Sequence, residues 1–191
     1  VRTEPLDPGY AYMRVTQFQV NTGDEVRREL EKLNADGKLK GLVLDLRNNP
    51  GGVLQAAVEV ADSFLESGLI VYTQGRLSNS ELRFSATSND PSKGVPMVVL
   101  INGGSASASE IVAGALQDHG RAVVMGTDTF GKGSVQTVLP LNNDRALKLT
   151  TALYYTPDGR SIQAQGIEPD IQVEQAKLTR EEVEMGVREA D

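Results

Sequence analysis

The chain has 191 residues, 39% of them hydrophobic, which is long enough to bury one sizeable core, and we expect a single domain. Its net charge of −7 and its lack of a Lys/Arg run argue against nucleic acid or an anionic membrane surface as a partner, because both bind clustered positive charge. The absence of cysteine excludes a disulfide, a zinc thiolate and a thiol nucleophile, and no apolar run reaches the roughly 18 residues of a membrane-spanning helix.

The first third of the chain predicts strands that alternate with helices. Residues Val1–Gly9 are polar and carry two prolines, so we expect a linker there. Polar and apolar residues then alternate over Tyr10–Val20, as in a half-buried strand, and the phase changes near Thr16, where we expect an end or a bulge. The mostly apolar run Leu39–Leu46 predicts a strand covered on both faces. Apolar residues at helical spacing predict two helices, Thr22–Leu33 and Val53–Leu65.

The rest of the chain is richer in strands. We expect a hairpin of Leu69–Thr73 and Leu82–Ala86 with Asn79 near its turn, followed by a flexible connector at Asn89–Gly94. A turn is expected at Thr156–Gly159. The other elements are a buried strand, a helix, a short strand, two long strands and a charged, partly helical tail: Val95–Ile101, Ser105–His119, Arg121–Gly126, Val135–Leu141, Ala146–Tyr155 and Lys177–Asp191.

The loop Arg47–Gly52 lies between a predicted strand and a predicted helix. In open α/β folds the carboxyl ends of strands gather the chemistry, so this loop is expected at a functional edge. Gly51 and Gly52 are by default turn glycines, although a glycine amide there could donate to an oxyanion. Three further residues near the loop are expected to form its turn: Asp45, Asn48 and Asn49.

Three serines, Ser105, Ser107 and Ser109, stand between a predicted buried strand and a predicted helix. Two interpretations of them stay open. Ser107 and Glu110 have the spacing of a capping box, in which the serine side chain satisfies a free amide of the helix. Alternatively, the free N–H groups and positive potential of a helix N-terminus suit a nucleophilic hydroxyl beside a developing oxyanion.

A serine nucleophile needs a base, and the only histidine, His119, would lie about 18 Å along the helix from Ser107, at ~1.5 Å per residue. This distance excludes a local Ser/His pair, and we expect His119 to interact with the carbonyl end of the helix. Lys132 is the remaining candidate, because its flanking glycines allow close approach to another element, although a loop lysine by default points to water. It would act as a base only if desolvation or nearby positive charge lowered its pKa. Gln136, on the following strand, either holds the amine of Lys132 or faces solvent.

Other site classes are absent from the sequence. It has no phosphate loop, no dinucleotide fingerprint and no His/Asp/Glu cluster with metal spacing, so it predicts neither a cofactor nor a metal. Asp118 and Asp128 lack a partner at defined spacing, and we expect them at the surface.

Five ordered blocks of sequence resemble one family, the carboxyl-terminal processing peptidases, or tail-specific proteases, which use a Ser-Lys dyad. Together they cover most of residues 10–171, which makes a chance match very improbable. The blocks are Leu46–Gly52, Gly104–Ile111 with Ala113–Gln117, Thr129–Gln136, Tyr155–Gln163, and Gly166–Asp170.

The resemblance implies a role for each candidate residue. The nucleophile falls on Ser107, the general base on Lys132 and the glutamine that orients the lysine on Gln136. The oxyanion hole would consist of the backbone N–H groups of Ala108 and Gly52. The implied reaction is hydrolysis of a peptide bond near a protein C-terminus through an acyl-enzyme, without a cofactor.

The family's fold is an α/β core like that of the ClpP and crotonase group, with a β-rich C-terminal part, in agreement with the predicted elements. We expect a catalytic core over residues 1–176 and a charged tail over 177–191. Family members normally carry a PDZ domain, which is missing here together with an export signal. Because the sequence starts at Val1 without a methionine, we expect a mature or trimmed fragment. The expected partners are protein substrates with exposed C-terminal tails, in a bacterial periplasm rather than a thylakoid lumen, and the oligomeric state stays open.

Two rival functions share this fold. A non-proteolytic binding module would be expected to lose the dyad, whereas Ser107 and Lys132 are both present. A crotonase-like acyl-CoA enzyme would use a similar oxyanion hole, but it predicts a site for a nucleotide tail and has no use for a Ser/Lys pair.

Overall fold

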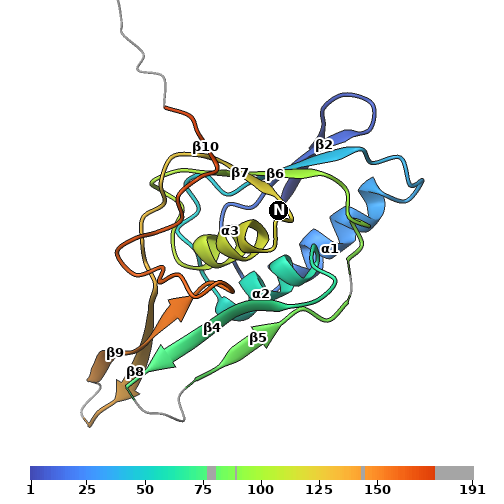
Figure 1. The fold of residues 1–191 in the computed structure, drawn as a ribbon. Coiled ribbons are helices and arrows are strands. Elements are labelled where there is room, and N and C mark those ends of the chain that lie inside the picture. Colours follow the sequence, from blue (N-terminus) through green and yellow to red (C-terminus); the bar gives the residue numbers. More distant parts are fainter. Residues whose placement is uncertain (77–80, 89, 143–144, 175–191) are drawn as a thin grey trace, which may run out of the picture.

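The computed structural model describes residues 1–76, 81–88, 90–142 and 145–174. Two β-sheets enclose a layer of three helices (Figure 1). The predicted α/β class with a β-rich C-terminal part is confirmed. The hydrophobic core lies between the helices and the two sheets and includes Met13, Leu44, Phe64, Ile101 and Leu116, all fully buried.

The first sheet has six strands in the order β1-β2-β3-β6-β7-β10. Strand β1 pairs with β2 in antiparallel fashion, and all other neighbours are parallel. Their carboxyl ends therefore meet at one edge of the sheet, where the loop after β3 and the turn after β6 lie side by side. The bounds are β1 Arg2–Pro5, β2 Tyr10–Arg14, β3 Gly41–Asp45, β6 Met97–Ile101, β7 Val123–Gly126 and β10 Ile171–Gln172.

The helices follow the patterns that predicted them. In α1 (Thr22–Leu33), Val26 and Leu30 are buried between charged residues that face water, as in an amphipathic surface helix. In contrast, α2 (Leu54–Asp62) and α3 (Ala108–Asp118) are apolar on almost every side, because both pack between the two sheets.

The second sheet is antiparallel throughout, with the order β5-β4-β9-β8. The predicted hairpin of β4 and β5 is confirmed, although Asn79 lies outside the described residues. Strands β8 and β9 form a long ribbon, and only the last residues of β9, from Ala152, pair with β4. The bounds are β4 Leu69–Gly75, β5 Arg83–Ser85, β8 Ser134–Pro140 and β9 Ala146–Tyr155.

Three expectations about the first sheet are corrected. The expected linker Val1–Gly9 contains β1, which pairs with β2 from Arg2 to Pro5. Strand β10 was missed, because two residues carry no periodicity that a sequence pattern could detect. The expectation that β3 is covered on both faces is wrong, since the described helices all lie on one side of the sheet (Figure 1) and Val43 is only half-buried.

The expected end of β2 is confirmed, because the strand stops at Arg14, two residues before the phase change at Thr16. The proposed tail, Lys177–Asp191, lies outside the described residues. Among the described helices, none is long and apolar enough to cross a membrane.

Candidate active site

The candidate site is built where β3 and β6 end. Asn49 shapes the loop after β3: its side chain donates to the carbonyl of Val15 (2.8 Å) and accepts the N–H of Gly51 (2.9 Å). Asn102 joins this loop to the turn after β6, because its side-chain oxygen accepts the N–H groups of Asn48 (2.9 Å) and Gly104 (3.0 Å). The predicted turn-forming role of Asn49 is confirmed, and the two loops are fixed to each other.

The three serines of the turn differ in their surroundings. The hydroxyl of Ser105 donates to the carbonyl of Leu46 (2.8 Å), and that of Ser109 donates to the carbonyl of Asn49 (2.9 Å). Both serines are completely buried, so they hold the two loops together. Only Ser107, the middle serine, is partly exposed to solvent.

Among the three serines, Ser107 also has a strained backbone. It is the N-cap of α3 and has φ 54° and ψ −109°, a region that residues with a Cβ atom rarely adopt. Such strain persists only where surrounding contacts impose it, and it is concentrated at functional sites. A serine on a sharp strand-to-helix turn is also the arrangement of the nucleophile in α/β-hydrolases, which presents the hydroxyl above the sheet edge.

Glu110 supplies the contacts that hold this backbone. Ser107 and Glu110 form a capping box, in which the Glu110 carboxylate accepts the N–H of Ser107 at 2.7 Å. The same carboxylate accepts the N–H groups of Gly131 (2.6 Å) and Lys132 (2.9 Å) and the hydroxyl of Thr129 (2.6 Å). We call these four contacts the Glu110 junction. The sequence predicted Glu110 only as half of a capping box. The structure shows that it also anchors the Lys132 loop.

The junction brings the two candidate dyad residues together. One oxygen atom of Glu110, Oε2, accepts from both Ser107 N and Lys132 N, so their backbones meet at a single atom. Glu110 is fully buried, and its four hydrogen bonds offset the cost of removing its polar oxygens from water. The backbone of the glycine-flanked loop is therefore held by a buried side chain of α3.

The side chains beyond this backbone are open to solvent. Lys132 and Gln136 are both exposed, and neither side chain makes a hydrogen bond or ion pair with another described residue. A β-bulge between Val135 and Gln136 shifts the register of β8 against β9. The structure therefore brings Lys132 to Ser107 through the backbone, while the amine is hydrated and is not held by Gln136.

The glycine loop packs directly against the serine turn. A Cβ atom on Gly51 would lie 2.7 Å from the carbonyl oxygen of Ala106 and 2.9 Å from Ala108 N, so only glycine fits there. Gly52 has φ 147° and bridges to Phe18, whose carbonyl oxygen would be 2.0 Å from an added Cβ. Within the described residues, the N–H groups of Gly52 and Ala108 have no acceptor. Both N–H groups are therefore free to donate to a bound group.

Asp45 is a buried ion-pair partner and not simply a turn former. Its carboxylate accepts two hydrogen bonds from the Arg47 guanidinium (2.9 and 2.8 Å) and one from the Tyr12 hydroxyl (2.5 Å), and Arg14 lies 3.6 Å away. Burial alone would raise the pKa of Asp45, but the hydrogen bonds from Arg47 and Tyr12 outweigh it and hold the pKa below its usual range. The hydrogen bond to Asp45 likewise raises the pKa of Arg47.

Two other titratable residues have structural contacts. His119 is the C-cap of α3, so its expected position at the helix end is confirmed, but its Nε2 lies 2.7 Å from the carbonyl of Leu69 in β4 and not from a carbonyl of the helix. The expectation that Asp118 lies at the surface without a partner is wrong, because its side chain is almost fully buried and pairs with Arg160. Asp128 is exposed as expected.

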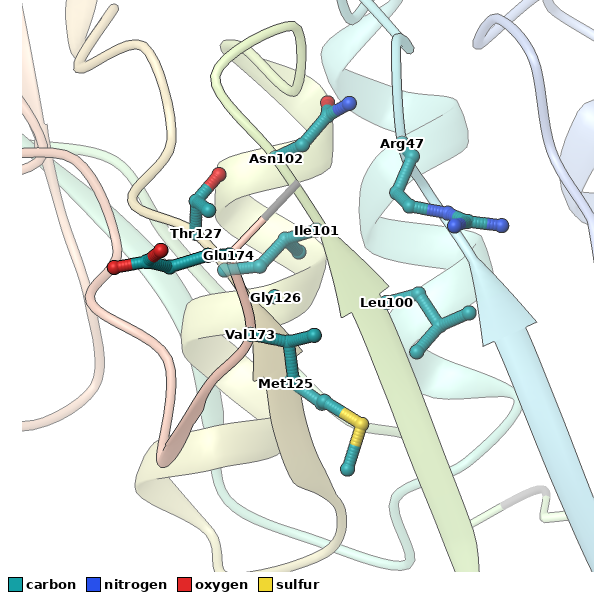
Figure 2. Close-up of a pocket in the computed structure, with 9 residues that line it drawn as sticks. All are labelled: Arg47, Leu100, Ile101, Asn102, Met125, Gly126, Thr127, Val173 and Glu174. Carbon is teal, nitrogen blue, oxygen red and sulfur yellow. The ribbon is translucent and has the colours of Figure 1, made fainter. Parts of the chain in front are cut away.

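A cavity of about 470 Å³ lies beside these loops, at the ends of β6 and β7 (Figure 2). Arg47 lies across it from Thr127 and Glu174, and Leu100 and Met125 form its apolar floor. Neither candidate dyad residue lines this cavity, although Asn102 from the turn after β6 does. In the described ranges no group of three or more Asp, Glu or His side chains could hold a metal ion.

Comparison with known proteins gives the same family at the level of sequence and of structure. The sequence model of Peptidase family S41 matches residues 9–173. The carboxy-terminal-processing protease of Bartonella bacilliformis is 56% identical over 167 residues, covering 86% of this chain and 38% of the relative. The carboxyl-terminal-processing protease of Synechocystis sp. is 44% identical over 173 residues, covering 90% of this chain and 40% of the relative.

Among solved structures, the photosystem II D1 C-terminal processing protease superposes with a TM-score of 0.80 at 39% identity, covering 86% of this chain and 42% of that one. This chain therefore spans about two fifths of the length of these relatives. The resemblance inferred from the sequence motifs is confirmed. With a family match over most of its length, the chain belongs to peptidase family S41.

Proposed function

We propose that this chain is the catalytic part of a serine endopeptidase that cuts proteins near their C-termini, with Ser107 as nucleophile and Lys132 as general base. The observation that carries the proposal is the shared oxygen of Glu110, which holds the backbones of these two residues together. The strained conformation of Ser107 supports the same assignment. The names of the related proteases support the choice of substrate.

In the proposed reaction the neutral amine of Lys132 takes the proton of the Ser107 hydroxyl as its oxygen attacks a peptide carbonyl carbon. The tetrahedral intermediate collapses when the C–N bond breaks, and the Lys132 ammonium gives its proton to the departing amine. Water then attacks the acyl-enzyme ester, again losing a proton to Lys132. When this second tetrahedral intermediate collapses, the Ser107 oxygen is the leaving group and takes the proton from Lys132. Both residues thus return to their starting forms.

The negative charge of each tetrahedral intermediate would be held by the N–H groups of Gly52 and Ala108. Both donors are unused, and the one on Ala108 lies at the positive end of α3. Preorganised donors of this kind stabilise a developing oxyanion without having to reorient during the reaction.

The exposure of Lys132 requires one change when substrate binds. Only the neutral amine is a base, and loss of surrounding water favours that form. A polypeptide lying over Ser107 would cover the amine and exclude water, and Gln136 would then orient it by a hydrogen bond. We therefore expect the base to act weakly in the free enzyme and more strongly in the complex.

Cleavage of casein or of an unfolded peptide tests the proposal, with Ser107→Ala and Lys132→Ala as the test variants. Lys32→Ala is the matched control, because Lys32 is another exposed lysine, on α1. Both test variants are expected to lose essentially all activity at neutral pH while they stay folded at the assay temperature, as checked by thermal unfolding. Equal cleavage by all four proteins would refute the dyad. A complete lack of cleavage would favour a binding module on the same fold.

We further propose that the protein works in a bacterial periplasm and that it recognises the C-terminal tail of its substrate. A homo-oligomer also stays a prediction. The domain bounds of 1–176 and 177–191 also remain predictions.

A further inference from the structure

Strand β8 is the last strand of the second sheet and has a neighbour on one side only. In the described residues β9 pairs with one of its edges, and nothing pairs with the other. Residues 136–140 are all exposed. An edge strand of this kind presents alternate N–H and C=O groups to any extended chain that approaches it.

This free edge begins at the candidate active site. Ser134, the first residue of β8, follows Lys132 by two positions, and Lys132 N shares the Glu110 oxygen with Ser107 N. The N–H of Gly133 donates to the Gln163 side chain (3.1 Å), and the Gly133 carbonyl accepts the N–H of Tyr154 (2.7 Å). The start of β8 is therefore fixed, and the strand leads away from Ser107 in a defined direction.

The side chains of the ribbon make one of its faces apolar. Leu139 pairs opposite Leu147, and Thr137 pairs opposite Leu149, so these four side chains share a face. Leu139, Leu147 and Leu149 are 43%, 44% and 41% exposed, respectively. Proteins commonly protect a free edge with charged side chains, but β8 carries none. Pro140 has no N–H and limits pairing to the residues before it.

We propose that the free edge of β8 binds the substrate as an added strand, with apolar substrate side chains at alternate positions over the Thr137 and Leu139 face. The occupant is the polypeptide that the proposed protease cleaves, so this inference rests on the proposed function. We assign antiparallel pairing, because the whole sheet is antiparallel and such pairs are more stable per residue. The paired residues of the substrate then precede the scissile bond, which lies at the Ser107 end of β8.

Two neighbouring proline variants, Thr137→Pro and Val138→Pro, test the strand. In an antiparallel edge strand one of two successive N–H groups points to the partner strand and the other points away. The variant that keeps the wild-type unfolding temperature has lost the outward N–H, and the other has lost a bond to β9. Thr137→Ala and Val138→Ala are the matched controls, since each removes a side chain but keeps the N–H.

Binding is measured in the Ser107→Ala background by fluorescence anisotropy of a labelled peptide of about ten residues with Val or Leu at alternate positions. We expect the outward proline to weaken the Kd at least about tenfold, the effect of one lost hydrogen bond, and the alanine control by less than about threefold. A peptide with N-methyl groups on alternate amides should bind to the protein without a proline substitution as weakly as the unmethylated peptide binds to the outward proline variant. Unchanged peptide affinity in the outward proline variant would overturn the proposal.

A second measurement separates this inference from the proposed function. A small fluorophosphonate that reacts with an activated serine needs no strand pairing, so it should label Ser107 equally fast in the proline variants and in the wild type. If Ser107 is labelled but the proline variants bind the peptide as well as the wild type does, the strand proposal is wrong and the protease proposal stands. No labelling of the wild type overturns the protease proposal and, with it, the identity of the occupant.

Discussion

Replacing Glu110 with glutamine should slow catalysis even under conditions where the protein stays folded. The side chain keeps its size but loses its charge, and one of its two oxygens becomes an NH2 donor. In either orientation the NH2 group faces two of the four donors of the Glu110 junction: Ser107 N and Lys132 N, or Thr129 Oγ1 and Gly131 N. Two buried donors are then left without an acceptor.

The cost follows from these contacts. Each buried donor without an acceptor destabilises the fold by about 1–3 kcal/mol, so Glu110→Gln should lower the free energy of unfolding by roughly 4 kcal/mol. This is a large part of the 5–15 kcal/mol that is typical of a domain, but it leaves the variant folded under mild conditions. A shift of about 1 Å between nucleophile and base is enough to lower kcat about 100-fold.

The assay combines urea unfolding with steady-state cleavage of an unfolded peptide at a temperature where all variants are folded. Asp62→Asn is the matched control, because Asp62 is another buried carboxylate, which accepts the N–H and hydroxyl of Thr87 (2.6 and 2.7 Å) far along the chain from the dyad. We expect both variants to be destabilised, but only Glu110→Gln should lose kcat at least about 100-fold with a KM within about threefold.

Equal losses of stability with equal, near-wild-type kcat in the two variants would refute the reasoning. The Glu110 junction would then be a helix cap and loop anchor without influence on the dyad.

The remaining predictions concern the glycine loop and the buried ion pair. Gly52→Ala should lower kcat at least about 100-fold, because the added Cβ would meet the Phe18 carbonyl oxygen and displace the proposed oxyanion donor; Gly37→Ala, with φ 63° and open space around it, should cleave like the wild type. Asp45→Asn should destabilise the protein by about 3 kcal/mol at pH 7. Because the pKa of Asp45 is lowered on folding, its contribution exists above the ordinary carboxyl pKa and is lost as pH falls through the lowered value, so the variant's urea midpoint should depend less on pH below about 4. A steeper acid dependence in Asp45→Asn than in the wild type would contradict this sign.

Local pattern was sufficient for much of the fold. The α1 bounds Thr22–Leu33 match the prediction, because its apolar spacing and turn residues agree with one another. Strand β1 was missed for the opposite reason, since Arg2–Pro5 is polar, contains proline and is stabilised only by pairing with β2. The second face of β3 could not be judged, because a run of apolar residues does not reveal whether a layer covers each side.

The contacts that connect the candidate site residues could not be predicted from the sequence. Ser107 was ambiguous between cap and nucleophile, and the structure shows that the capping partner Glu110 also holds the Lys132 loop. No spacing in the sequence shows that the Glu110 carboxylate accepts hydrogen bonds both from Ser107, which precedes it, and from Lys132, which follows it beyond strand β7. The exposure of Lys132 matches the default expectation for a loop lysine, because flanking glycines permit close backbone approach without burying the side chain.

Mass spectrometry of the chain after reaction with a fluorophosphonate gives the most direct test of the dyad. The account predicts one adduct, on Ser107, that forms at least about 1000-fold more slowly in Lys132→Ala, as expected when a nucleophile loses its general base. An adduct on another serine, or equal rates with and without the lysine, would contradict it.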